Sequence, residues 1–332
     1  MGKPIRRTIR SRAGDSFLDT LRAVSGLLDK RLIFVTGKGG VGKSTVAAAL
    51  GMVAARQGRR TIVAEVAHQD RVARAFTEED SHFREVRMAP DLYTISIDPQ
   101  HALEEYLRIQ VRVRALADVL SGSRMFQYFA VATPGMSELV TMGKIWELAQ
   151  LERPSGSAAY DLVIVDAPAT GHGVAIMRTP KTFADIARIG PVAQQGRAIH
   201  ATITDGDFTG VVAVALPEEM PVSETIMLSG ILREELGLDI DRIVVNGLYP
   251  DRFKPAEAQQ LRGALDHAGS PESRAALRAA LSEHVRASEQ REQIARLAEA
   301  GDTTPARLPF VFCEQFGRDE FEALSQALEA TL

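Results

Sequence analysis

Short apolar runs alternate along this chain with longer stretches of helical periodicity. The apolar runs are rich in β-branched residues, and several contain hardly any polar position, as expected for parallel strands that are covered on both faces. The pattern predicts strands at residues 31–36, 60–66, 92–97, 160–166, 210–216, 242–247 and 306–312. Strands and helices that alternate in this way predict an α/β fold with a doubly wound, mostly parallel sheet.

Three helices have recognisable sequence signals. Residues 43–58 end in Gly58, which is typical of the position just beyond a helix. Residues 223–236 begin with Ser223, which predicts a serine-capped start. The last helix, residues 318–332, repeats apolar residues at helical spacing, and we expect it to pack against the sheet.

Two stretches contain more helix than one crossover connection needs. Residues 98–152 have a helical pattern throughout although they lie between predicted strands, and residues 180–207 are similar. We predict that both form a helical subdomain over one edge of the sheet, inserted into a domain that spans residues 31–332. Residues 1–30 are interpreted as a basic arm with a leading helix, and residues 255–300 as a solvated helix pair.

Composition excludes several classes of protein. The net charge of −4 over 332 residues argues against bulk binding to nucleic acid. Cys313 is the only cysteine, so the chain has no intrachain disulfide and no metal or iron–sulfur site built from several of its own thiolates. The sequence has no run of about 18 apolar residues and no apolar signal segment. We therefore expect a cytoplasmic protein without stable membrane insertion.

The segment FVTGKGGVGKST, residues 34–45, carries the strongest chemical signal. It follows a predicted strand and opens a predicted helix, which is the context of a phosphate-binding loop. Glycines let the backbone N–H groups point at phosphate oxygens, and the helix N-terminus adds positive charge. Lys43 is expected to contact the β- and γ-phosphates. The residues expected to bind the nucleotide are Gly37, Lys38, Gly39, Gly40, Val41, Gly42, Lys43, Ser44 and Thr45.

A second acidic motif completes this chemistry. Asp166 ends the apolar run of DLVIVDAPATGH, where a carboxylate is expected to hold Mg²⁺ directly or through water. The hydroxyl of Ser44 is the expected second ligand of the ion. Together these residues predict an ATP-hydrolysing enzyme whose cofactors are ATP or ADP and Mg²⁺.

Lys38 is not needed by an ordinary phosphate-binding loop. The sequence KGGVGKS, residues 38–44, resembles the deviant Walker A motif of the dimeric P-loop ATPases that include MinD, the nitrogenase iron protein and ArsA. In that class the early lysine reaches across a dimer interface to the phosphates bound by the other subunit. The resemblance implies that Lys38 is a catalytic residue for a partner's nucleotide, and that a second copy or a paralogue completes the site.

Further motifs resemble the ArsA family, which also contains the ATPase that targets tail-anchored membrane proteins. EVAHQ (65–69) resembles the switch I sequence DPAHN, and DAPATGH (166–172) resembles the switch II sequence DTAPTGH. The segments at 134–148, 216–246 and 308–324 also resemble family motifs in the right order. The chain is identified as a member of this family from about residue 32 to residue 324.

The resemblance assigns further roles. It implies that Asn246, Pro309 and Phe310 hold the adenine, and an amide can pair with the adenine edge through one donor and one acceptor. Glu65 stands where the family has the aspartate that positions the attacking water. A glutamate carries the same carboxylate one methylene further out. Switch II has Pro168–Ala169 where the family has Ala–Pro.

Three functions are consistent with these residues. The first is an ATPase switch that handles a client or partner protein, with the helical segments providing a surface for an apolar helix or a membrane-protein client. The expected client residues are Leu103, Tyr106, Leu107 and apolar positions between 119 and 129. The second is a pump-driving ATPase for arsenite or antimonite, although the cysteine cluster and the second ATPase unit are missing. The third is a weakly active nucleotide-binding scaffold paired with an active paralogue. The identity of the client, and the choice between homodimer and heterodimer, stay open.

Overall fold

A computed structural model of the chain describes residues 26–66, 70–76, 81–110, 133–300, 304–314 and 316–331. The strands are β1 Leu32–Gly37, β2 Thr61–Val66, β3 Val86–Ala89, β4 Leu92–Ile97, β5 Leu162–Asp166, β6 Thr209–Ala215, β7 Arg242–Leu248 and β8 Ala306–Pro309. They form one sheet in the order β3-β4-β2-β5-β1-β6-β7-β8. Every pair of neighbours is parallel except β3 and β4. The predicted doubly wound α/β class is confirmed.

Strand prediction was wrong in detail at the sheet's two edges. The edge strand β3 was not predicted, because its sequence VRMA mixes polar and apolar positions over only four residues. It pairs with β4 in antiparallel orientation, with a register shift between Arg87 and Ala89. At the other edge β8 ends at Pro309, three residues before the predicted end of the strand.

The helices connect these strands. Their bounds are α2 Lys43–Arg56, α3 Arg71–Phe76, α4 Pro99–Gln110, α7 Met136–Leu148, α8 Thr170–Ala187, α9 Pro191–Ile203, α10 Glu219–Leu236, α11 Pro255–Asp266, α12 Pro271–Ala300 and α13 Arg318–Thr331. Gly58 has a φ of +79° just beyond α2, as predicted. The predicted start of α10 was wrong. The helix begins four residues earlier, and the Ser223 hydroxyl donates a hydrogen bond back to the Glu219 carbonyl from inside it.

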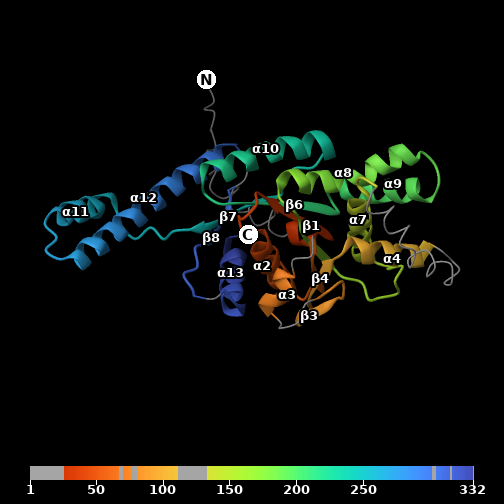
Figure 1. The fold of residues 1–332 in the computed structure, drawn as a ribbon, viewed down its shortest axis with the longest axis horizontal. Coiled ribbons are helices and arrows are strands. Elements are labelled where there is room, and N and C mark those ends of the chain that lie inside the picture. The colour runs from red at the N-terminus through yellow and green to blue at the C-terminus, as the bar shows by residue number, and fades with distance from the viewer. Residues whose placement is uncertain are drawn as a thin grey trace, which may run out of the picture.

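Helices cover both faces of the sheet (Figure 1). Alternate strand residues point to opposite faces, so Ile33 and Val35 belong to one core cluster while Leu32 and Phe34 belong to the other. The first cluster is closed by α2 and by the predicted final helix α13, which buries Phe321 and other apolar residues. The second cluster is closed by α7, α8, α9, α10 and α12.

The two predicted helical stretches are partly helical. In the first, α4 and α7 are helices, residues 111–132 lie outside the described residues, and 149–152 are not helical. The prediction for 149–152 was wrong, because α7 ends at Leu148 and leads into a proline-, serine- and glycine-containing segment that favours turns. In the second, α8 and α9 approach closely where a Cβ on Gly196 would lie 2.6 Å from the Pro180 carbonyl oxygen. The division into a separate subdomain stays a prediction.

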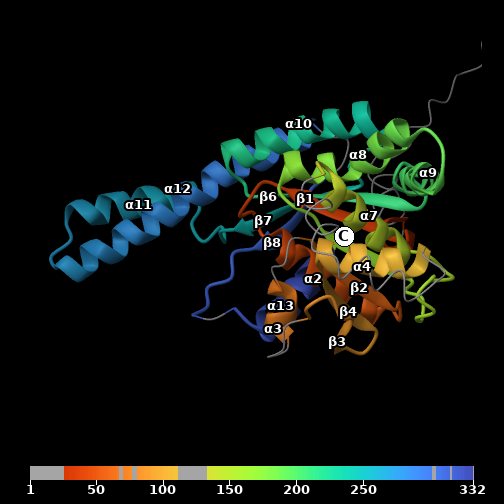
Figure 2. The same ribbon diagram turned by 45° about the vertical axis from the view of Figure 1, so that its right-hand side comes forward.

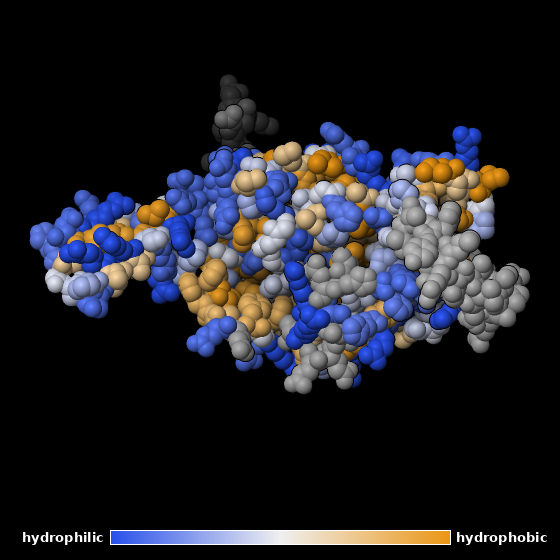
Figure 3. All heavy atoms as spheres, viewed as in Figure 1, coloured by the Kyte–Doolittle hydropathy of each residue, from blue (hydrophilic) through white to orange (hydrophobic). Residues whose placement is uncertain are grey.

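The hairpin of α11 and α12 extends away from the sheet (Figure 2). Its buried residues are Ala258, Ala287, Ile294 and Leu297, and much of its surface is hydrophilic in Figure 3. It is therefore the solvated helix pair that the sequence predicted. None of the helices in the described part of the chain is long and apolar enough to cross a bilayer.

A buried ion-pair network fixes the turn that follows α7. The side chain of Arg153 is 0% exposed and donates hydrogen bonds of 2.5–3.1 Å to the carboxylates of Glu85 and Glu147. The Tyr160 hydroxyl donates to Glu85 and the Ser155 hydroxyl to Glu147. Burial opposes ionisation of Glu147, but the bonds from Arg153 and the nearby positive charges hold its pKa below its usual range.

We predict that Arg153→Met lowers the free energy of unfolding by about 3–5 kcal/mol at neutral pH, because it leaves two carboxylates without their cation. Arg233→Met removes an exposed pair with Asp239 and should cost less than about 1 kcal/mol. Urea unfolding measures both. The pKa values of Glu85 and Glu147 are lower in the folded protein than in the unfolded chain. The two carboxylates therefore stabilise the fold above their unfolded pKa, and this stabilisation is lost in acid. The deficit of Arg153→Met should therefore shrink near pH 4. Equal costs for the two variants would contradict the buried network.

Candidate functional site

The predicted phosphate-binding loop lies between the end of β1 and the start of α2. Gly37 has a φ of +150°, and a Cβ there would lie 2.1 Å from the Val214 carbonyl oxygen of β6. Gly42 has a φ of +91°, and its Cβ would lie 2.3 Å from the Asn246 side-chain nitrogen of β7. A side chain at either position would collide with a neighbouring strand, so the loop needs glycine there.

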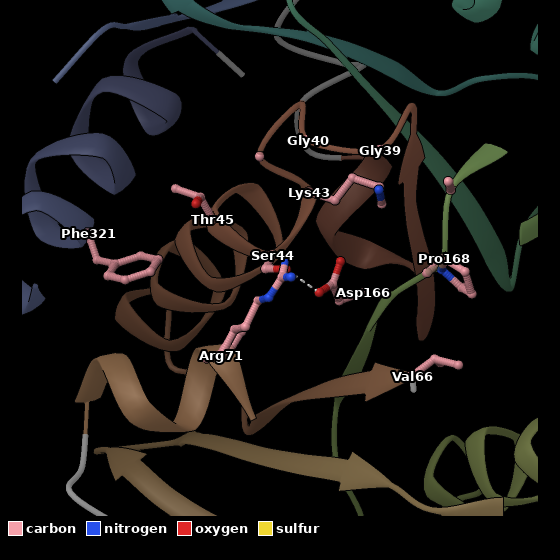
Figure 4. Close-up of a pocket in the computed structure, with 14 residues that line it drawn as sticks. Gly39, Gly40, Lys43, Ser44, Thr45, Val66, Arg71, Asp166, Pro168 and Phe321 are labelled. Atoms are coloured by element: carbon pink, nitrogen blue, oxygen red, sulfur yellow. Dashed lines mark hydrogen bonds between the residues drawn. The ribbon is translucent and has the colours of Figure 1, made fainter. Parts of the chain in front are cut away.

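The loop forms one wall of a pocket of about 450 Å³ (Figure 4). Lys43 at the start of α2 donates a hydrogen bond of 3.1 Å to the Lys38 carbonyl, so its ammonium group lies across the loop. The Ser44 hydroxyl donates a bond of 2.5 Å to Oδ2 of Asp166, the last residue of β5. The structure thus brings together the three residues that sequence predicted to hold phosphates and Mg²⁺.

Several buried oxygen atoms beside this pocket have no hydrogen-bond partner among the described residues. They include Asp166 Oδ1, Glu65 Oε2 and Thr36 Oγ1, and all three come from the carboxyl ends of adjacent strands. Buried unpaired oxygens are costly, which favours a site that binds a cation or a water there. A carboxylate and a serine hydroxyl are ligands that suit Mg²⁺, so Asp166 and Ser44 fit the expected ion.

Glu65 lies next to Asp166, since the two residues are register partners of β2 and β5. Its Oε1 atom accepts hydrogen bonds from the backbone N–H groups of Arg71 (2.8 Å) and Val72 (3.1 Å) at the start of α3. Burial raises the pKa of Glu65 to about 7, and the negative charge of Asp166 adds to this effect. Burial also raises the pKa of Asp166, although Ser44 and nearby cations oppose the shift.

A second carboxylate fixes the start of α3. Asp70 is buried, and its Oδ1 accepts bonds from the backbone N–H and the hydroxyl of Ser81. The Ser81 hydroxyl in turn accepts a bond from the N–H of Ser96 on β4. Residues 67–69, which complete the predicted switch I, lie outside the described residues. Both ends of that gap are therefore held by buried carboxylates.

Lys38 points away from the phosphate side of its own loop and toward α10. Its ammonium lies 2.6 Å from Oε1 of Glu224, and both side chains are about one-third exposed. The other oxygen of Glu224 accepts a bond of 3.4 Å from Thr170, the first residue of α8. Glu224 thus links the loop to the helix that follows switch II.

The predicted adenine residues lie at the ends of β7 and β8. The side-chain nitrogen of Asn246 donates a bond of 2.9 Å to the Val41 carbonyl and so contacts the loop. Phe310 follows Pro309 and stacks on Tyr249, with ring centroids 5.1 Å apart and planes 8° apart. Phe312 adds a third ring beside Phe310 and is 62% exposed. The roles of Asn246, Pro309 and Phe310 in base binding stay predictions.

Sequence reasoning missed several residues of this region: Arg71, Glu224, Tyr249, Phe312, Gln290 and Phe321. Tyr249 could have been noticed, because it lies three residues beyond Asn246. The others carry no local sequence signal and are brought to the site only by the folding of the chain. Gln290 on α12, for example, accepts a bond from the Tyr249 N–H and donates one to the Gly247 carbonyl.

Comparison with known proteins agrees with this geometry. The family model of anion-transporting ATPases (ArsA) matches residues 30–195 and 184–267, which is more than half of the chain. The chain belongs to the anion-transporting ATPase family. Membership makes it an ATPase and confirms the predicted family and enzyme class.

The relatives of this chain carry different names. ATPase BagA of Mycobacterium tuberculosis is 29% identical over 248 residues, which cover 73% of this chain and 72% of that protein. ATPase GET3 of Chaetomium globosum is 26% identical over 273 residues, which cover 71% of this chain and 78% of that protein. A putative arsenical pump-driving ATPase of Halobacterium salinarum is 28% identical over 255 residues, covering 72% of this chain but 39% of that protein.

We predict that Glu65→Gln stabilises this ATPase in the absence of nucleotide and Mg²⁺, and that the gain grows with pH. Because the folded pKa of about 7 lies above the unfolded value, the folded wild type holds the extra proton, and its stability falls as pH rises from about 4.5 to 7. The gain should be small at pH 5 and approach about 3 kcal/mol at pH 8.

Urea unfolding at the two pH values measures this gain. Glu289→Gln is the matched control, because it makes the same change at an exposed carboxylate of α12. If Glu65→Gln and wild type lose stability equally between pH 5 and 8, Glu65 is not the buried titrating group.

Proposed function

We propose that this chain is a Mg²⁺-dependent ATPase that works as a nucleotide-controlled dimer and couples ATP hydrolysis to the handling of a client or partner protein. One observation carries the proposal: Lys43, Ser44 and Asp166 converge on one pocket, while Lys38 of the same loop is directed to the exposed helix α10. The two lysine side chains of the loop therefore point to different places, Lys43 into the pocket and Lys38 toward α10.

The pocket's own residues account for hydrolysis. Lys43 and the loop N–H groups bind the β- and γ-phosphates, and Ser44 with Asp166 holds Mg²⁺, which neutralises charge on the phosphates when it is bound. Glu65 orients the attacking water through the oxygen that makes no bond to α3. Its pKa of about 7 leaves it partly ionised at neutral pH, which suits a general base.

Lys38 is proposed to serve the partner's nucleotide. An ion pair as exposed as Lys38–Glu224 contributes about 0–1 kcal/mol, so a triphosphate from another subunit can compete for the lysine. Beside this pair a groove of about 350 Å³ lies between α8 and α10, and the exposed side chains of Met227 and Ile231 line it. A second copy or a paralogue of this chain would cover these apolar side chains when the dimer closes.

The client surface is proposed to lie on the helices that follow switch II. Ile186, Ile189 and Val192 are exposed at the turn between α8 and α9, with relative exposures of 73%, 84% and 40%. Because α8 begins four residues after Asp166, a change at the γ-phosphate can move this turn. Among the expected client residues, Leu103 packs against the core, and those at 119–129 lie outside the described residues.

We predict different losses for the two lysines. Lys43→Ala should weaken ATP binding on the order of 10- to 100-fold, because it removes a charged contact to the phosphates. Lys38→Ala should leave the affinity of the single chain within twofold but lower turnover and ATP-dependent dimerisation. Calorimetry measures affinity, and sedimentation measures dimerisation.

Lys181→Ala, on the exposed face of α8, is the control for loss of one surface lysine. Equal losses of ATP affinity in Lys38→Ala and Lys43→Ala would rule out a separate role for Lys38. Nucleotide binding without turnover in the wild type would instead favour the scaffold function.

The pump-driving alternative makes a separate prediction. Arsenite and antimonite should not stimulate hydrolysis, because soft metalloids need clustered thiolates, whereas Cys313 is the only cysteine of the sequence and is exposed. Turnover with and without each oxyanion checks this. A severalfold stimulation that Cys313→Ser abolishes would support the metalloid function.

A further inference from the structure

Arg71 extends from the start of α3 into the nucleotide pocket. Figure 4 shows its guanidinium beside Ser44 and Asp166, and the residue lines the same pocket as the phosphate-binding loop. Among the described residues its backbone N–H is bonded, but its guanidinium makes no hydrogen bond or ion pair with them. The charge therefore lies near the Asp166 carboxylate but forms no ion pair or hydrogen bond with it.

The charge of Arg71 also acts on the other ionisable groups of the pocket. Burial is the main cause of the lowered pKa of Lys43, and the charge of Arg71 adds to it. The same charge opposes the rise that burial causes in the pKa of Asp166. Two cations, Lys43 and Arg71, thus repel one another across one pocket. An anion placed between them relieves that repulsion.

The backbone of Arg71 is held more firmly than an exposed side chain would require. Glu65 Oε1 accepts its N–H at 2.8 Å. The preceding residue, Asp70, is bonded through its side chain to Ser81. Val72, the next residue, is fully buried in the core. The arginine therefore projects from a fixed point, so its long side chain reaches the pocket without the need to order a loop.

The chemistry of the pocket decides which anion this is. The loop and Lys43 surround the inner phosphates, while Ser44 and Asp166 lie where the Mg²⁺ and the terminal phosphate are expected. A planar guanidinium matches two phosphate oxygens, and it carries its charge at every pH at which the enzyme works.

We propose that Arg71 is a catalytic arginine that contacts the γ-phosphoryl group of ATP bound to its own chain. This inference rests on the proposed ATPase mechanism. In hydrolysis a bond forms between the water oxygen and the γ-phosphorus, and the bond from that phosphorus to the bridging oxygen breaks. ADP leaves with the bonding electrons, and the water proton passes through Glu65 to solvent. Arg71 transfers no proton, but its charge stabilises the negative oxygens of the phosphoryl group in the transition state.

The test compares Arg71→Ala and Arg71→Lys with Arg74→Ala, which removes the same charge from the same helix. Calorimetry with Mg²⁺ gives the affinities for ADP and for a non-hydrolysable ATP analogue, and steady-state assays give kcat and KM. Arg71→Ala should keep its ADP affinity within twofold, lose about tenfold in affinity for the analogue, and lose about 10²- to 10³-fold in kcat. Arg71→Lys should recover part of each loss, and Arg74→Ala should behave as the wild type.

Retained ADP affinity also shows that the Arg71 variants fold. The proposal is overturned if ADP and the analogue lose affinity equally, if neither kcat nor the analogue affinity changes, or if Arg74→Ala reproduces the losses. If the wild type binds nucleotide without hydrolysing it, the catalytic function fails. If Arg71→Ala then lost affinity for the ATP analogue but not for ADP, the contact with the γ-phosphate would still be supported.

Discussion

Two buried carboxylates on neighbouring parallel strands control the rest of the site. Glu65 and Asp166 are register partners at the carboxyl ends of β2 and β5, so the sheet places two buried carboxyl groups side by side. Each is stabilised differently. Asp166 has Ser44 and nearby cations, while Glu65 has two backbone N–H groups of α3. The arrangement separates a carboxylate suited to hold a metal ion from one suited to accept a proton, as pairs of unlike environments do in other enzymes.

The same pair connects the strands to two helices beside the pocket. Glu65 fixes the start of α3, and Asp166 immediately precedes the turn into α8. Glu224 joins Thr170 of α8 to Lys38 of the loop. The pocket beside Asp166 is therefore separated from the exposed groove between α8 and α10 by only a few side-chain contacts. Each step is a single side-chain contact between neighbouring elements.

Local spacing explains which features sequence could predict. The phosphate-binding loop lies within nine residues, so the positions of Lys43 and Ser44 follow from one short stretch. Apolar runs indicate the buried strands, so the fold class and the strand-end position of Asp166 follow in the same way. The ion pair of Lys38 with Glu224 joins residues 186 positions apart, and no local pattern marks it. Arg71 was missed for a similar reason, because a charged residue at a helix start is ordinary until the pocket is known. The start of α10 was misread because Ser223 can bond backward inside a helix as well as cap one.

The projecting hairpin has the geometry of a long lever arm. Helix α12 is bonded to the end of β7 through Gln290, and about twenty residues of helix separate that contact from its far end at Pro271. At 1.5 Å per residue this arm is about 30 Å long, so a tilt of about 10° at Gln290 displaces the tip by about 5 Å. A rearrangement of the Tyr249–Phe310 stack that is barely measurable at the strand ends would thus be readily seen at the tip by a distance probe.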